Sequence, residues 1–113
     1  MSGRFESQVA VVTGAGSGIG RATALALARD GAGVLAVDRD GEGLDETLRQ
    51  GNGPGPMVAM AADVAGDTTP DDAIALCRAE LGAPSILVNN AGIGDARPAH
   101  LTDDANLDGF LDI

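Results

Sequence analysis

Closely spaced glycines follow the first apolar segment of the sequence. That segment, Gln8 to Thr13 (QVAVVT), leads directly into GAGSGIG, which ends at Gly20. Glycine permits a tight turn at Gly14, close approach of a ligand to the backbone at Gly18, and close helix packing at Gly20. A helix that begins here directs free N–H groups and the positive end of its dipole at the turn, which suits a phosphate group. A glycine-rich turn without a ligand is the alternative.

An acidic residue ends the second apolar segment. Asp38 lies 20 positions after Gly18, where a dinucleotide fold places a carboxylate that hydrogen-bonds the adenosine ribose. A carboxylate here repels a 2′-phosphate, so Asp38 favours NAD over NADP. Arg39 favours NADP, because an arginine beside this position can hold the 2′-phosphate. We weigh Asp38 above Arg39, since the glycine-rich turn has no basic residue; alternatively, Asp38 only caps the next turn.

Strand and helix patterns alternate along the chain and must position these residues. Short apolar runs predict strands at 8–13, 33–38, 57–62 and 85–89, and residues 51–56 are a glycine- and proline-rich loop. Helices are predicted at 18–30 and about 41–50. A third helix follows an N-cap at Thr69 and carries Ile74, Cys77 and Leu81 on one face. Residues 92–100 are expected to be loop, and a last helix opens at 101–104.

This order predicts an α/β fold with a Rossmann-type doubly wound parallel sheet. The expected strand order is 3-2-1-4, with right-handed crossovers and helices on both faces. Residues 1–113 would form a truncated, dinucleotide-binding half-domain that lacks a second half.

Composition excludes several classes of protein and site. The chain has 113 residues, 44% of them apolar, and a formal net charge of −10. This charge argues against nucleic acid and anionic membranes as partners, and no apolar run approaches the ~20 residues that span a bilayer. No hydrophobic signal segment opens the sequence, so a cytoplasmic location is expected. The single cysteine, Cys77, and the single histidine, His100, exclude an internal disulfide and a multi-histidine metal site.

Four motifs in this order resemble the short-chain dehydrogenase/reductase family. They are Thr13–Gly20, Asp38, Asp63-Val64 and Asn89-Asn90-Ala91-Gly92, and together they extend over nearly the whole chain. The resemblance implies NAD(H) as cofactor and an alcohol or carbonyl compound as substrate. In that family the aspartate of the Asp-Val pair contacts the adenine amino group, and its valine supplies a backbone N–H to the ring. The resemblance gives these roles to Asp63 and Val64.

The resemblance also implies roles for the last motif. Asn90 would lie against the ribose, and Ala91 and Gly92 would let the cofactor approach the backbone. With the turn and the residues at the end of the second strand, the predicted cofactor-binding set is Gly14, Ser17, Gly18, Ile19, Gly20, Asp38, Arg39, Asp63, Val64, Asn90, Ala91 and Gly92.

The sequence departs from the family in its catalytic residues. It contains no Tyr and no Lys, whereas the family uses a Tyr-x-x-x-Lys pair, in which the tyrosine is the general acid/base, together with a serine. The family's catalytic asparagine would follow a segment like Ala105–Ile113, and Asn106 lies too early to be it. His100 lies in a polar loop and is expected to be exposed. The chain therefore has no predicted catalytic residue.

Three functions remain open on the sequence alone. They are a portion of an NAD-dependent short-chain dehydrogenase that is inactive by itself, a stand-alone nucleotide-sensing module, and one half of a split enzyme. The free edge of the predicted strand at 85–89 would invite pairing with another chain, so a homo-oligomer or a complementing chain is expected. The substrate is not readable, because only Gly94–Ala99 could touch it.

Overall fold

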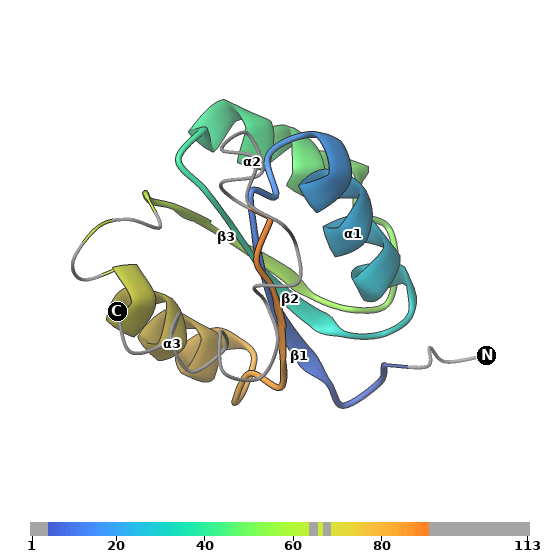
Figure 1. Cartoon of the computed structure of the whole chain (residues 1–113). Coiled ribbons are helices and arrows are strands. Elements are labelled where there is room, and N and C mark those ends of the chain that lie inside the picture. Colours follow the sequence, from blue (N-terminus) through green and yellow to red (C-terminus); the bar gives the residue numbers. More distant parts are fainter. Residues whose placement is uncertain (1–4, 64–65, 67–68, 91–113) are drawn as a thin grey trace.

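The computed structural model describes residues 5–63, 66 and 69–90. Strands and helices alternate along this part of the chain (Figure 1). The elements are β1 (Val9–Thr13), α1 (Gly18–Arg29), β2 (Gly33–Asp38), α2 (Gly41–Gln50), β3 (Met57–Ala61), α3 (Thr69–Glu80) and β4 (Ile86–Val88). The predicted bounds are confirmed to within one residue, while the predicted loop at 92–100 and the helix from 101 lie outside the described residues. No helix in the described ranges is both long and apolar enough to cross a membrane.

The four strands form one parallel sheet in the order β3-β2-β1-β4. The predicted strand order and the Rossmann-type fold are therefore confirmed. In the register of the sheet, Thr13 pairs with Val37 of β2, and Val12 pairs with Val88 of β4. Since the strands are parallel, their carboxyl ends meet at one edge of the sheet. β2 and β3 lie on one side of β1, and β4 lies on its other side, so the strand order reverses at β1. Ligands of such sheets bind at this point of reversal.

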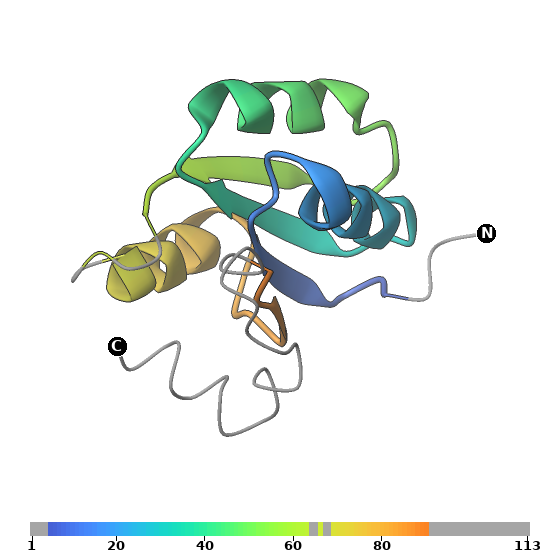
Figure 2. The same cartoon turned by 45° about the horizontal axis from the view of Figure 1, so that its top comes forward.

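Helices cover both faces of the sheet, with α1 and α2 on one face and α3 on the other (Figures 1 and 2). Side chains along β1 alternate between two apolar clusters. Ala10 and Val12 pack with α1 and α2, and Val9 and Val11 pack with α3. Covered on both faces, β1 and most of β2 are buried, which explains why these strands read as continuous apolar runs.

The buried face of α3 differs from the sequence prediction. Ala73 and Cys77 are its buried core residues, and Leu81 packs against the same cluster just beyond the helix. Ile74 was predicted to share this face, but its side chain is half-exposed. The reason is geometric, because Ala73 and Cys77 are one helical turn apart, whereas Ile74 points about 100° away from Ala73 around the helix axis.

Candidate functional site

The glycine-rich turn begins where β1 ends at the carboxyl edge of the sheet. Gly14 and Gly18 have φ angles of 65° and 56°. Residues other than glycine adopt this left-handed backbone conformation only with strain. Apart from its chain neighbours and the nearby backbone of its own helix, no atom of the described residues lies within 4 Å of the position that a Cβ would take at Gly18. The backbone there borders open space, as close approach by a ligand requires.

Gly20 brings α1 against the turn. A Cβ at this position would lie 2.0 Å from the carbonyl oxygen of Gly14 and 2.8 Å from Nδ2 of Asn90. Both distances are shorter than van der Waals contact, so only glycine fits. The structure therefore gives Gly20 the packing role that its spacing in the sequence indicates.

The first turn of α1 presents backbone N–H groups to the carboxyl edge of the sheet. Helical hydrogen bonding starts with Arg21, whose N–H donates to the carbonyl of Ser17 at 3.1 Å; the N–H groups before it have no acceptor within the helix. The side chain of Ser17 makes no capping hydrogen bond, and the first turn has no acidic residue. Ser17, Gly18 and Ile19 are exposed, the last by 64%. Such a helix terminus suits an anion.

Asp38 joins the end of β2 to the turn. Its Oδ2 accepts a hydrogen bond from the N–H of Gly16 at 2.8 Å, and its Oδ1 accepts one from the N–H of Asp40 at 3.0 Å. The carboxylate is half-buried, whereas the neighbouring Arg39 is exposed. Each carboxylate oxygen can accept a further hydrogen bond, so Asp38 can still bind hydroxyl groups of a ligand.

The ends of β1 and β4 are connected through the hydroxyl group of Thr13. This hydroxyl donates to Oδ1 of Asn89 at 3.1 Å and accepts from the backbone N–H of Asn90 at 2.8 Å. The side chain of Asn90, half-buried, lies beside Gly20. The structure thus brings the end of β4, the glycine-rich turn and the start of α1 together.

The other predicted residues are only partly described. Asp63 follows β3 and is exposed, and its carbonyl oxygen accepts hydrogen bonds from the Gly66 N–H at 2.9 Å and the Thr69 hydroxyl at 2.6 Å. The other predicted cofactor-binding residues, the predicted substrate loop and two polar residues that the sequence excludes from catalysis lie outside the described residues; they are Val64, Ala91, Gly92, Gly94–Ala99, His100 and Asn106.

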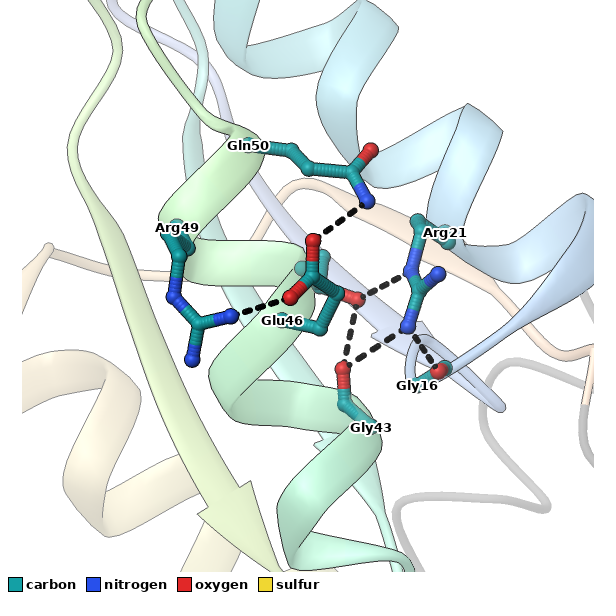
Figure 3. Close-up of polar contacts among 7 residues, drawn as sticks. Gly16, Arg21, Gly43, Glu46, Arg49 and Gln50 are labelled. Atoms are coloured by element: carbon teal, nitrogen blue, oxygen red, sulfur yellow. Dashed lines mark hydrogen bonds and ion pairs between the residues drawn. The ribbon is translucent and has the colours of Figure 1, made fainter.

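Two polar residues at the turn were missed by sequence reasoning. Arg21 of α1 reaches α2 with its guanidinium group (Figure 3). There its Nε donates to the hydroxyl of Thr47 at 2.9 Å. Thr47 is fully buried, and its hydroxyl donates to the carbonyl oxygen of Ala15 at 2.7 Å. One signal was present, because an arginine near a helix N-terminus opposes the helix dipole and calls for a local reason.

The charged surface of α2 lies beside this contact and has its own partners. Glu46 forms an exposed ion pair with Arg49 and accepts a hydrogen bond from Gln50 at 3.0 Å (Figure 3). The hydrogen bond from Gln50, followed by the charge of Arg49, lowers the pKa of the Glu46 carboxyl below its ordinary value. Glu46 is therefore ionised near neutral pH, and it places negative charge on the outer side of α2.

Comparison with known proteins agrees with this geometry. The family model described as short chain dehydrogenase matches residues 8–113. A curated relative, the "Probable oxidoreductase EphD" of Mycobacterium tuberculosis, is 42% identical over 95 residues, which are 83% of this chain but only 16% of that protein. The chain therefore spans a small part of this relative's length.

Solved structures of the same kind match the fold. Carveol dehydrogenase from Mycobacterium avium, in complex with NAD, has a TM-score of 0.75 and 31% identity, over 99% of this chain and 46% of that one. L-Sorbose reductase from Gluconobacter frateurii, complexed with NADPH and L-sorbose, has a TM-score of 0.71 and 37% identity, over 81% of this chain and 34% of that one. With its parallel sheet, its glycine-rich turn and the family match over most of its length, the chain belongs to the short-chain dehydrogenase family.

Proposed function

We propose that this chain binds a nicotinamide dinucleotide, NAD(H) in preference to NADP(H), as the cofactor-binding portion of an oxidoreductase. The observation that carries the proposal is the exposed N-terminus of α1, where backbone N–H groups without helical acceptors adjoin the left-handed Gly18. A pyrophosphate at this place would receive hydrogen bonds and the positive end of the helix dipole. The exposed side chain of Ile19 would be covered by the bound cofactor.

The adenosine half of the cofactor would lie over the end of β2. Asp38 is held there by two backbone N–H groups, and it would accept hydrogen bonds from the ribose hydroxyls. A 2′-phosphate would place further negative charge beside this carboxylate. Solved structures similar to this chain contain NAD in one case and NADPH in another, so the preference for NAD rests on Asp38. Asp63, Val64, Asn90, Ala91 and Gly92 complete the proposed binding set.

The chemistry of the whole protein would be hydride transfer between the cofactor and an alcohol or carbonyl substrate. This part of the proposal rests on family membership, because the 113 residues contain no Tyr and no Lys. The catalytic groups would have to come from further residues of the same protein or from a complementing chain. β4 pairs with β1 and with no other described strand, which leaves a place for one more strand of either origin. A cytoplasmic location stays a prediction that cell fractionation would check.

Calorimetric titration of the chain with NAD, NADP and ADP tests the proposal. NAD should bind more tightly than NADP, and ADP should bind nearly as well as NAD, because the proposed contacts are to the adenosine and the pyrophosphate. NAD binding more than about tenfold tighter than ADP, a difference of ~1.4 kcal/mol, would require groups that hold the nicotinamide. NADP binding as tightly as NAD would show that Arg39, and not Asp38, decides the preference. Absence of binding by all three ligands would refute the proposed function.

A further inference from the structure

The peptide unit at Gly16 is held from both sides by charged side chains. Its N–H donates to Oδ2 of Asp38 at 2.8 Å. Its carbonyl oxygen accepts from Nη2 of Arg21 at 2.6 Å (Figure 3). Hydrogen bonds to charged groups are the stronger ones, and two of them fix the orientation of the peptide plane between them. This peptide lies just before Ser17, where the exposed N–H groups of α1 begin.

The guanidinium group of Arg21 is fixed in its turn by α2. Nη2 also donates to the carbonyl oxygen of Gly43 at 3.1 Å, and Nε donates to the Thr47 hydroxyl at 2.9 Å. The same hydroxyl reaches back to the turn and donates to Ala15 at 2.7 Å. Two adjacent carbonyl groups of the turn are therefore bound by side chains: that of Ala15 by Thr47, and that of Gly16 by Arg21. Thr47 belongs to α2, and Arg21 is held against α2 by its other hydrogen bonds.

Close packing leaves this arrangement little freedom. Thr47 has no exposed surface, and a Cβ at Gly43 would lie 2.5 Å from the carbonyl oxygen of Gly16. The backbone of α2 thus approaches the turn as closely as glycine allows. A rigid support of this kind determines where the turn, and the N–H groups that follow it, can point.

Arg21 also keeps its charge close to the turn. The acceptors of its hydrogen bonds are two carbonyl oxygens and one hydroxyl, and it forms no ion pair within the described residues. An arginine in this position opposes the helix dipole. The contacts to the turn account for its presence there.

We propose that Arg21 and Thr47 are positioning residues for the phosphate-binding turn. By holding the carbonyl groups of Ala15 and Gly16, they aim the N–H groups at the start of α1 toward the pyrophosphate of the cofactor. This inference rests on the proposed function, because it assigns a role toward the same ligand. Neither side chain needs to touch the cofactor.

Titrations with ADP and with adenosine separate positioning from general structural support. Arg21→Met and Thr47→Val should each weaken ADP binding about tenfold, equivalent to ~1.4 kcal/mol, while adenosine, which lacks phosphate, keeps its affinity. Thr47→Ser retains the hydroxyl and should restore ADP binding. The control is Arg49→Met, which removes the same charge from the exposed surface of α2 and should leave both affinities unchanged. Far-UV circular dichroism in the titration buffer shows that each variant is folded.

The possible results have distinct meanings. Wild-type chain that fails to bind ADP would refute the proposed function itself. If the wild type binds and Thr47→Val binds equally well, or if ADP and adenosine weaken together, the positioning role alone is refuted. Should Thr47→Val not fold, Arg21→Lys decides, since lysine keeps the charge but lacks the planar fork that reaches three acceptors. Loss of about tenfold in ADP affinity by Arg21→Lys supports positioning. Wild-type affinity of that variant refutes it, because the positive charge alone then suffices.

Discussion

Asp38 accepts a hydrogen bond from Gly16, with 2.8 Å between the carboxylate Oδ2 and the backbone nitrogen. The residue proposed to bind the ribose therefore also holds the turn proposed to bind the pyrophosphate. A Cβ at Gly16 would lie 2.8 Å from the same oxygen atom, so the contact leaves no room for a side chain in the present arrangement. The two halves of the binding site form one hydrogen-bonded unit.

Replacing Asp38 by asparagine should narrow the preference for NAD over NADP. The amide oxygen of asparagine can still accept from the Gly16 N–H, but the charge that repels a 2′-phosphate is gone. NAD binding should weaken by roughly 1.5–3 kcal/mol, the value of a hydrogen bond to a charged group, and NADP binding should weaken less. The control is Asp40→Asn, because Asp40 caps α2 and asparagine caps equally well. Calorimetry that finds the same narrowing in both variants would contradict a specific role for Asp38.

Substitution of Gly20 by alanine should destabilise the chain. The added methyl group would meet the Gly14 carbonyl oxygen at 2.0 Å, and overpacking of this kind costs typically 1–3 kcal/mol. Gly41→Ala is the matched control, since its Cβ would meet only the Cβ of Ala61 at 3.8 Å. That variant should gain about 0.4–1 kcal/mol from the smaller entropy of its unfolded chain. Urea unfolding measures both, and equal stability of the two variants would contradict the packing described.

Much of the fold could be predicted from the sequence because each element has a local signal. The strands are apolar runs, α1 and α2 have helical patterns, and residues 51–56 are rich in glycine and proline. The assignment of Ile74 to the buried face of α3 was wrong, because a small residue, Ala73, occupies that face instead. Alanine is only weakly apolar, so the prediction assigned the buried position to its larger apolar neighbour Ile74.

The candidate site could be predicted only where its residues form a motif. Gly14, Gly18 and Gly20 stand at fixed spacing, and the structure explains each of them by its backbone angle or by close packing. Arg21 and Thr47 carry no such pattern, because they are 26 positions apart and meet only through the packing of α1 on α2. Contacts between distant segments depend on how the helices pack, and the spacing of residues along the sequence does not predict that packing.

Cys77 should be unreactive in the folded chain. Its side chain is fully buried and Sγ donates to the carbonyl oxygen of Gly82 at 3.4 Å. Burial raises the pKa of the thiol above its ordinary value, and the charge of Arg78 opposes this only in part. Ellman's reagent should therefore react slowly without denaturant and rapidly in urea. Fast reaction of the native chain would contradict the burial of Cys77.

The same shift predicts a loss of stability at alkaline pH. The unfolded thiol ionises at its ordinary pKa, while the buried thiol of Cys77 keeps its proton to higher pH. Above that pKa the unfolded state binds fewer protons than the folded state, so the free energy of unfolding falls as pH rises. Urea titrations between neutral and alkaline pH measure this fall. Cys77→Ala should show a smaller decline, and an identical decline in both would assign the effect to other groups.

The chain of 113 residues should show no dehydrogenase activity by itself. Hydride transfer to a carbonyl leaves an alkoxide that needs a proton donor, and positioned acid–base groups contribute typically 10²–10⁴-fold. The sequence has no Tyr or Lys, and His100 is the one group whose unperturbed pKa suits the task. NADH absorbance followed with a broad panel of carbonyl compounds should give no turnover. Turnover that disappears in His100→Ala would make the chain an enzyme in its own right.

Mapping ADP onto the chain by NMR tests the central claim most directly. Backbone amide signals are recorded during a titration with ADP, and binding at the carboxyl edge of the sheet predicts saturable shifts at Gly16–Gly20, Asp38 and Asn90. Signals of the loop at 51–56, which packs at the opposite end of α1 beside Ala28, should stay in place. No saturable shift, or shifts concentrated at 51–56, would contradict dinucleotide binding at the glycine-rich turn.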